Sequence, residues 1–490
     1  MARRRQLLQN AAVLVAAALG AAACASPEIP VVAAPATPMP TATPEATVAP
    51  AAPTPTPAPF DNEPGVTADA VRIGVIADVA GTVELGAENN LGAFEAIDAW
   101  AATVNATGGI AGGRTIEIVR FDSQVVRHAE QIDLVCNSDI FALVGSAALD
   151  DGAGLDQLTA PDCALPDFPA VASTVERLRS PGTFVSNPVT GQIWNAGWAR
   201  WYADTYPVAV DAAATVLFEF PAAQVNGERM IEAASAQGFE FASRSTADPS
   251  TDFSVEAAEL IDEDARALVW RNSARRLLDL IRELGGDRDR MRLIDCGQAC
   301  YSRAWVEEAG RLGDGVSVWL PILPFEDAEF SRELARYLFA LPTVHPDAVP
   351  TVVGVEAWAA GLLFQEAVDR SIGTGTADYD PDSISRAGVI AAAQTITAWD
   401  ANGLHGVSNP AERIPSPCFT LLTLEDGTWD RTFPARRGVM NCRPENLVEL
   451  QFTPGLDSTG EVEISSEDEG DDIADDSLGG GESPTPEPEG

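Results

Sequence analysis

The hydrophobic pattern of residues 71–124 predicts a β-α-β unit. Residues 71–76 read VRIGVI, a short apolar strand, and residues 91–109 carry apolar side chains at the spacing of an amphipathic helix. The phrase GGIAGG at 108–113 then leads into a second strand, TIEIVRF, at 115–121. Because parallel strands joined by a helix leave a crevice at their carboxyl ends, we expect a ligand site at that edge of the sheet.

The alternation of strand and helix continues in two successive runs, which predicts two doubly wound lobes. Further strands of the first run are expected at 141–144 and 169–173, and those of the second run at 215–220, 267–270, 291–295 and 316–321. Helices are expected at 256–261, 274–284 and 349–371, and a late hairpin at 418–441 with Asp426 and Gly427 at its turn. Three crossings between the lobes are expected to form a hinge that closes on a ligand.

Residues 1–23 have the features of an export signal. Arginines at positions 3–5 precede an apolar run that is too short to span a bilayer and is followed at once by Cys24. The sequence LGAAAC at 19–24 resembles a bacterial lipoprotein signal, although Ala21 stands where a larger aliphatic residue is usual. Because RRQLL at 4–8 is also similar to a twin-arginine motif, both export routes stay open. We expect an extracytoplasmic protein, lipid-anchored to the bacterial cell membrane through Cys24.

The segments that flank the predicted lobes have compositions typical of disorder. Residues 24–65 are rich in proline, alanine and threonine, which favours an extended tether. Residues 456–490 contain thirteen acidic and no basic residues, which favours a solvated tail over a calcium site. The net charge of −42 opposes binding to nucleic acid phosphates, so no nucleic acid partner is expected.

The residue types exclude several kinds of catalysis. All 31 basic residues are arginine, so P-loop nucleotide binding, lysine Schiff-base chemistry and serine–lysine hydrolysis are excluded. The G-x-S-x-G, H-E-x-x-H and G-x-G-x-x-G motifs are absent, and the three histidines do not favour a catalytic triad. The sequence therefore predicts a protein that is not an enzyme, and no cofactor is expected.

Beside Cys24 the chain has six cysteines, an even number that suits disulfides in an oxidising compartment. Neighbourhood in the sequence favours three pairs, although other pairings of six cysteines stay open: Cys136 with Cys163, Cys296 with Cys300, and Cys418 with Cys442. A metal site would require histidines at ligand spacing, which His128, His345 and His405 do not provide. We therefore predict disulfides and no metal.

These segments together resemble the branched-chain amino acid binding proteins of ABC transporters. The resemblance is carried by VRIGVIADVAG at 71–81, NATGGIAGG at 105–113, FALVGS at 141–146 and PAVASTVERL at 169–178. It implies an α/β protein of the type I periplasmic-binding fold, with two doubly wound Rossmann-like lobes joined by a three-strand hinge. By analogy the N-lobe covers residues 66–187 and 326–400, and the C-lobe covers 188–325 and 401–455.

The resemblance also implies where a ligand carboxylate is held, since the family uses hydroxyls and backbone amides after the third and fourth N-lobe strands. The fourth-strand loop here is Ala172, Ser173 and Thr174. Thr174 is assigned to the carboxylate, with a helix N-cap as the alternative role. In the third-strand loop the family's ligand-binding serine falls near Ala148 or Leu149.

Other positions depart from the family pattern. Ser146 is a candidate replacement for the missing serine, or else a turn residue. In the first loop Leu85 precedes the glycine where the family often has an aromatic residue, and Glu84 beside it is a candidate partner for a cation, or else an exposed loop residue.

On the C-lobe, Val225 stands where the family has an aromatic lid. The acid that would balance a ligand ammonium falls near Asp295 and Gln298, although a strand-end aspartate more often caps backbone. Trp194, Trp270 and Trp358 are candidate aromatic residues near the cleft, with core packing as the alternative.

The predicted function is that of a substrate-binding lipoprotein. It would capture a small organic solute, an amino acid or a related amide or carboxylate, and deliver it as a monomer to the permease of an ABC transporter. A lipid-anchored ligand sensor or surface interaction protein of the same fold, not coupled to transport, is the alternative.

Overall fold

The computed structural model describes residues 63–80 and 90–451. The chain divides into two units, Met1–Pro57 and Ala58–Gly490, and every described residue lies in the second. The predicted export signal, Cys24, residues 25–62 of the tether, Glu84, Leu85 and the acidic tail lie outside the described residues. Among the helices of the described part, none combines the length and the apolar character that a membrane crossing requires.

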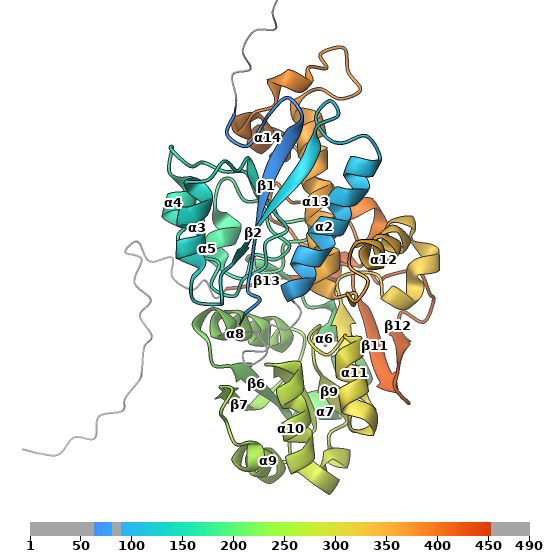
Figure 1. Cartoon of the computed structure of the whole chain (residues 1–490). Helices are drawn as coiled ribbons and strands as arrows, with labels where there is room; N and C mark the ends of the chain where they lie inside the picture. The colour runs from blue at the N-terminus through green and yellow to red at the C-terminus, as the bar shows by residue number, and fades with distance from the viewer. Residues whose placement is uncertain (1–62, 81–89, 452–490) are drawn as a thin grey trace, which may run out of the picture. The chain divides into compact units, whose positions relative to one another are not determined.

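Four strands of the first run form a parallel sheet in the order β2-β1-β3-β4, of which Figure 1 labels β1 and β2. They are β1 (Ala70–Ala77), β2 (Thr115–Asp122), β3 (Ala142–Val144) and β4 (Asp167–Phe168). Helix α2 (Leu91–Ala106) lies between β1 and β2 in the chain. The β-α-β unit predicted from the hydrophobic pattern is therefore confirmed.

The inner strand β1 of the first sheet is buried on both faces. Ile73 and Val75 pack in the main core with Trp100 of α2, whereas Ile76 belongs to a separate cluster with Ile132 of α3 (His128–Cys136). Side chains of a strand alternate between faces, so a strand covered by helices on both sides is apolar along its whole length. Two short helices, α4 (Leu155–Thr159) and α5 (Val175–Arg179), complete this region.

The second run forms a larger mixed sheet in the order β12-β11-β10-β9-β8-β6-β7. Its parallel strands are β6 (Ala213–Phe218), β7 (Phe241–Ala247), β8 (Ala267–Arg271), β9 (Leu293–Asp295) and β10 (Val316–Leu320). Its helices are α6 (Gly197–Thr205), α7 (Pro207–Val210), α8 (Pro221–Ser235), α9 (Phe253–Asp262), α10 (Ala274–Leu284) and α11 (Arg303–Ala309). Together the two sheets give the α/β class that the sequence predicts.

The predicted hairpin extends this sheet antiparallel to β10. It consists of β11 (Thr420–Glu425) and β12 (Thr428–Phe433). Asp426 and Gly427 have φ angles of 48° and 77°, the left-handed values that a two-residue type I′ turn requires. The hairpin and its turn are therefore confirmed.

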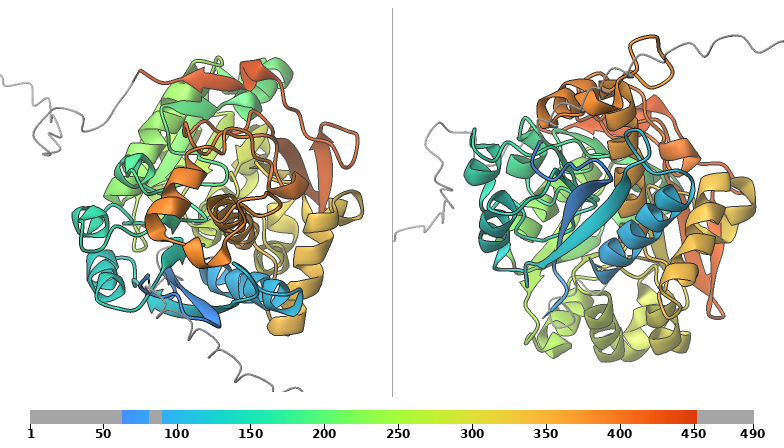
Figure 2. Two further views of the ribbon diagram at one scale, coloured as in Figure 1. Left: turned by 90° about the horizontal axis from the view of Figure 1, so that it is seen from above. Right: turned by 45° about the horizontal axis from the view of Figure 1, so that its top comes forward.

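A late segment of the chain returns to the first sheet. Helix α13 (Val352–Ser371) begins at Thr351, whose side chain accepts a hydrogen bond from the backbone of Gly354. It packs against α2, β3 and β4, and the two turned views of Figure 2 keep α2 (blue) next to α13 (orange). Gly361 makes this contact possible, because an added Cβ would lie 2.5 Å from the ring of Trp100.

The remaining elements connect and flank these layers. They are α12 (Arg332–Val344), α14 (Arg386–Ala393), and a small sheet of β5 (Ile193–Asn195) with β13 (Leu447–Glu449). Short 3-10 helices lie at Gly285–Arg290, Gly310–Gly313, Phe325–Phe330, Pro381–Ser383, Ala401–Gly403 and Pro444–Asn446. The residue boundaries given above for an N-lobe and a C-lobe stay a prediction.

One sequence expectation needs correction, and one strand of the larger sheet was not foreseen. The strand predicted at 169–173 is a loop, and β4 ends at Phe168. Pro169 has no N–H to donate to a sheet, and the amide of Ala170 instead donates to the carbonyl of Ser146 at 2.9 Å. Strand β7 was not predicted, because it pairs only with β6 at the sheet edge and carries polar, exposed residues that lack an apolar run.

The structure forms the three disulfides favoured by sequence neighbourhood. They join Cys136 to Cys163, Cys296 to Cys300, and Cys418 to Cys442. Within the described ranges, no group of three or more histidine, cysteine and acidic side chains is arranged to hold a metal ion.

Candidate functional site

The loops that follow β1, β3 and β4 meet at the carboxyl edge of the first sheet. Ala77 at the end of β1 pairs in parallel with Ala147, which extends the β1–β3 contact beyond the regular strands. Ser146 is buried, and its Oγ accepts a hydrogen bond from the amide of Ile76 at 3.1 Å. The hydroxyl of Ser146 therefore joins two strands, and Ala148 next to this turn is also buried.

The backbone donors of the fourth-strand loop bind a carboxylate of the same chain. The amide of Ser173 donates to Asp151 Oδ2 at 2.6 Å, and the amide of Thr174 donates to Asp151 Oδ1 at 2.9 Å. Thr174 Oγ1 also donates to Asp151 Oδ1 at 2.7 Å. Asp151 thus receives three hydrogen bonds from the residues that were predicted to hold a ligand carboxylate.

Thr174 has a second role that the sequence analysis gave as its alternative. Its Oγ1 accepts a hydrogen bond from the amide of Arg177 at 3.2 Å and so caps α5. Ser173 Oγ donates to the carbonyl of Ala148 at 2.6 Å, which ties the two loops together. Ala172 is buried, and its carbonyl accepts a hydrogen bond from Thr190.

A second aspartate organises the loops in the same way. Asp78, directly after β1, is fully buried, and its Oδ2 accepts a hydrogen bond from the amide of Leu149 at 2.7 Å. Its Oδ1 accepts hydrogen bonds from Ser123 Oγ at 2.5 Å and from the amide of Val125 at 2.8 Å. The amide of Leu149, another predicted ligand position, is therefore also directed at an internal carboxylate.

The carboxylates of this edge lie in a poorly hydrated environment. Burial raises the pKa of Asp151 to about 7, against the opposing effects of Arg177 and of the hydrogen bonds from Ser173 and Thr174. Burial also raises the pKa of Asp150, and the negative charge of Asp78 raises it further. The edge therefore carries a high density of acidic groups.

A buried ion pair lies beneath these loops and fixes their position. Arg177 is 0% exposed and makes two hydrogen bonds of 2.7 Å to the carboxylate of Asp167. Its Nη1 also contacts the carbonyl of Asp151 at 3.3 Å and His128 Nε2 at 3.1 Å. Burial and the charge of Arg177 lower the pKa of His128 to about 3, so this histidine is neutral at pH 7 and accepts a hydrogen bond from the guanidinium.

Helix α8 of the second sheet reaches the fourth-strand loop directly. Asn226 Nδ2 donates to the carbonyl of Ser173 at 2.6 Å. One turn later on the same helix, Arg229 donates to the carbonyl of Gly191. Val225, where an aromatic lid was expected, is half-buried next to Asn226. The predicted ligand loop and α8 are therefore in contact.

The predicted acid on the second sheet already has a cationic partner. Asp295 is fully buried at the end of β9 and pairs with Arg271 at 2.7 Å. Tyr202 donates a further hydrogen bond to Asp295 at 3.2 Å. Burial raises the pKa of Asp295, against the opposing charge of Arg271. Gln298, three residues later, is half-buried.

Of the three candidate tryptophans, Trp194 is half-buried, whereas Trp270 and Trp358 are 0% exposed. Trp270 packs against Phe253, and its Nε1 donates to the carbonyl of Ser273 at 2.9 Å. Trp358 packs against Tyr337, and its Nε1 donates to Glu333 at 2.8 Å. Their burial and satisfied hydrogen bonds favour core packing, the alternative given for both residues.

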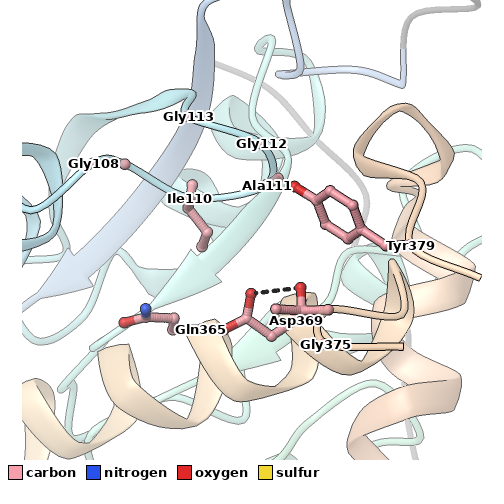
Figure 3. Close-up of a pocket in the computed structure, with 11 residues that line it drawn as sticks. Gly108, Ile110, Ala111, Gly112, Gly113, Gln365, Asp369, Gly375 and Tyr379 are labelled. Carbon is pink, nitrogen blue, oxygen red and sulfur yellow. Dashed lines mark hydrogen bonds between the residues drawn. The ribbon is translucent and has the colours of Figure 1, made fainter. Parts of the chain in front are cut away.

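A surface cavity of about 460 Å³ lies at a different edge of the same sheet. Figure 3 shows Gln365, Asp369 and Tyr379 pointing toward the glycine-rich loop 108–113. Thr374 donates a hydrogen bond to Asp369 at 3.0 Å. Because this loop precedes β2, the cavity lies at the amino ends of the strands, away from the loops that follow β3 and β4.

Sequence reasoning did not assign Asp78, Asp151 or Asn226 to the site. One signal was present for the two aspartates, because both follow strands of one parallel sheet, whose carboxyl ends share an edge. For Asn226 there was no local signal, since its contact with Ser173 joins elements 53 residues apart in the sequence.

The model of the family described as periplasmic binding protein matches residues 70–428. No curated protein matches the sequence. Solved structures do match, but their sequence identities to this chain are low, so the likeness shows the fold alone.

Three solved structures illustrate this likeness. A fatty acid ABC transporter substrate-binding protein from Thermomonospora curvata is 17% identical with a TM-score of 0.64, over 77% of this chain and 95% of that one. A solute-binding protein of an R. palustris ABC transporter in complex with benzoate is 16% identical with a TM-score of 0.59, over 76% and 98%. A branched-chain amino acid transporter substrate-binding protein from Streptococcus pneumoniae in complex with isoleucine is 14% identical with a TM-score of 0.58, over 74% and 98%. The chain thus has the type I periplasmic-binding fold.

Proposed function

We propose that this chain, which belongs to the periplasmic binding protein family, is an extracytoplasmic receptor that captures a small organic solute between two lobes. It delivers the solute to the permease of an ABC transporter. The observation that carries the proposal is the contact of the fourth-strand loop of one sheet with α8 of the other, made by the hydrogen bond from Asn226 to Ser173. A ligand that enters there meets groups from both sheets, as capture by closure requires.

The chemistry of this contact supports binding in preference to catalysis. The groups that line it are backbone amides, carbonyls, hydroxyls, an asparagine side chain and the carboxyl of Asp151, whose oxygens already accept three hydrogen bonds from the loop. Two of the three histidines, His128 and His405, are buried, and burial lowers the pKa of His128 to about 3 and that of His405 to about 4. Neither is placed to exchange protons with a ligand near pH 7.

The fold neighbours support a small organic ligand. They are a substrate-binding protein of a fatty acid ABC transporter, a solute-binding protein in complex with benzoate, and a transporter substrate-binding protein in complex with isoleucine. An amino acid or a related amide or carboxylate is therefore the class to test first in this chain, which we expect to act as a monomer.

Titration calorimetry of the purified chain with amino acids, their amides and short carboxylates tests capture. We expect at least one compound to bind with a dissociation constant in the micromolar range or below, about −8 kcal/mol or stronger. Asn226→Ala should weaken that binding, and Glu228→Ala on the exposed side of α8 is the matched control. Heat signals at the dilution background for every compound would contradict the proposal.

Anchoring through a lipid on Cys24 is a separate part of the proposal, based on the signal-like sequence before it. Cys24→Ser removes the thiol to which a lipid is attached, so we expect the protein to move from the membrane fraction to the soluble extracytoplasmic fraction. Ser26→Ala, two residues later, should leave the protein in the membrane fraction. Fractionation and immunoblotting measure both, and a Cys24→Ser protein that stays with membranes refutes lipid anchoring.

A further inference from the structure

In the loops that follow the strands of the first sheet, backbone amides and a hydroxyl donate hydrogen bonds to aspartates of the same chain. Asp151 accepts hydrogen bonds from the amides of Ser173 and Thr174 and from the Thr174 hydroxyl, at 2.6 to 2.9 Å. Asp78 accepts a hydrogen bond from the amide of Leu149 at 2.7 Å. These donors lie beside the contact with Asn226, where the proposed function places the ligand.

An internal carboxylate competes with a ligand carboxylate for these donors. Two adjacent amides and a hydroxyl that converge on one point form a site for a single anion, and charge-assisted hydrogen bonds of this kind are the strong ones. Asp151 is joined to the loop through the chain, so it is present at a high effective concentration that a dilute ligand does not match. If a ligand carboxylate approached the same point, the donors there would already be hydrogen-bonded to Asp151, and the Asp151 carboxylate would repel it.

The surrounding charges add to this effect. Asp150 lies near Asp78, whose charge raises the pKa of the Asp150 carboxyl. Arg177, which contacts the carbonyl of Asp151, is buried and already donates to both carboxylate oxygens of Asp167. Its other neighbour, His128, carries no charge at pH 7, since burial and Arg177 keep its pKa near 3. Above a pH of about 7, where the Asp151 carboxyl is ionised, the loops therefore present negative charge to an incoming ligand.

We propose that Asp151 determines specificity at this site, because its carboxylate takes the place that a ligand carboxylate would occupy. The ligand accordingly meets the loop with a neutral or positively charged group, such as an amide or an amine. The part of this inference that concerns the ligand rests on the proposed function. The part that concerns Asp151, as the carboxylate bound by the loop, rests on the hydrogen bonds alone.

Chemical rescue tests the role of Asp151 without knowledge of the ligand. In Asp151→Ala the three donors lose their acceptor, so the melting temperature of the full chain should fall and then rise with added acetate. Sodium chloride and acetamide at matched concentration should not restore it. Wild type and Asp156→Ala, which removes an exposed carboxylate five residues away, should show no specific response to acetate. If Asp151→Ala does not fold, Asp151→Ser keeps one acceptor oxygen and still leaves room for acetate.

Matched ligand pairs test the specificity. At pH 8, where the Asp151 carboxyl is mostly ionised, wild type should bind isoleucinamide or benzamide at least about tenfold more tightly than isoleucine or benzoate, because like charges placed together are repelled. In Asp151→Ala or Asp151→Ser the preference should shift toward the carboxylate. Acetate without effect on either variant, or tighter binding of the carboxylates by wild type, overturns the inference. Failure of the proposed function has a different signature, in which acetate rescues the variants but none of the four compounds binds wild type.

Discussion

Replacing Arg177 by methionine is expected to lower the free energy of unfolding by about 3 to 5 kcal/mol. The guanidinium is 0% exposed and supplies two hydrogen bonds of 2.7 Å to Asp167, which is itself buried. Methionine fills a similar volume but leaves a buried carboxylate without its cation. Chemical denaturation of the purified proteins, followed by circular dichroism, measures the loss.

Two further variants separate the ion pair from the general cost of a substitution in α5. Arg179→Met lies two residues later on the same helix and has no ion pair among the described residues, so its effect should stay within about 0.5 kcal/mol. Combining Arg177→Met with Asp167→Asn removes the unpaired charge and should recover part of the loss. An Arg177→Met protein as stable as Arg179→Met would show that this pair does not hold the loops.

Replacing Phe364 by alanine is expected to cost about 3 to 5 kcal/mol. Its ring is 0% exposed and lies among three others, with centroids 5.5 Å from Phe168, 6.3 Å from Trp100 and 6.4 Å from Phe141. Alanine at this position would open a cavity between α13 and the first sheet. Urea unfolding monitored by tryptophan fluorescence measures the change.

The matched control is Phe339→Ala on α12, where the side chain is 76% exposed. Its removal should change the stability by less than about 0.5 kcal/mol. If both substitutions have equal effects, α13 is not an integral cover of the first sheet, and the assignment of residues 326–400 to the N-lobe loses its support.

The parts of the fold that were predictable depend on regular local patterns. The apolar run of β1, the helical spacing of α2 and the Asp426-Gly427 turn each follow from a short stretch of residues, and each is confirmed. The three disulfides were predictable because each pair is close in the sequence. Strand β7 was not predicted, because its sequence has no apolar run and it forms a strand through its pairing with β6 at the sheet edge.

The site was less predictable because its contacts join distant segments. The fourth-strand loop could be identified from the pattern PAVASTVERL, but the sequence does not indicate that the amides of this loop donate hydrogen bonds to Asp151. Similarly, Asp295 was a candidate partner for a ligand ammonium until the structure placed Arg271 2.7 Å away. Both aspartates acquire their partners from neighbouring strands of a sheet, and that proximity follows from strand order, which local periodicity does not encode.

Hydrogen–deuterium exchange of the full chain, with and without the pooled amino acids, amides and short carboxylates, tests the central claim most directly. Capture between the two sheets predicts that added ligand slows exchange at two distant segments together, the fourth-strand loop at 172–174 and the start of α8 at 221–226. Unchanged exchange at both segments, or protection confined to another region such as the glycine-rich loop at 108–113, would contradict capture at this site.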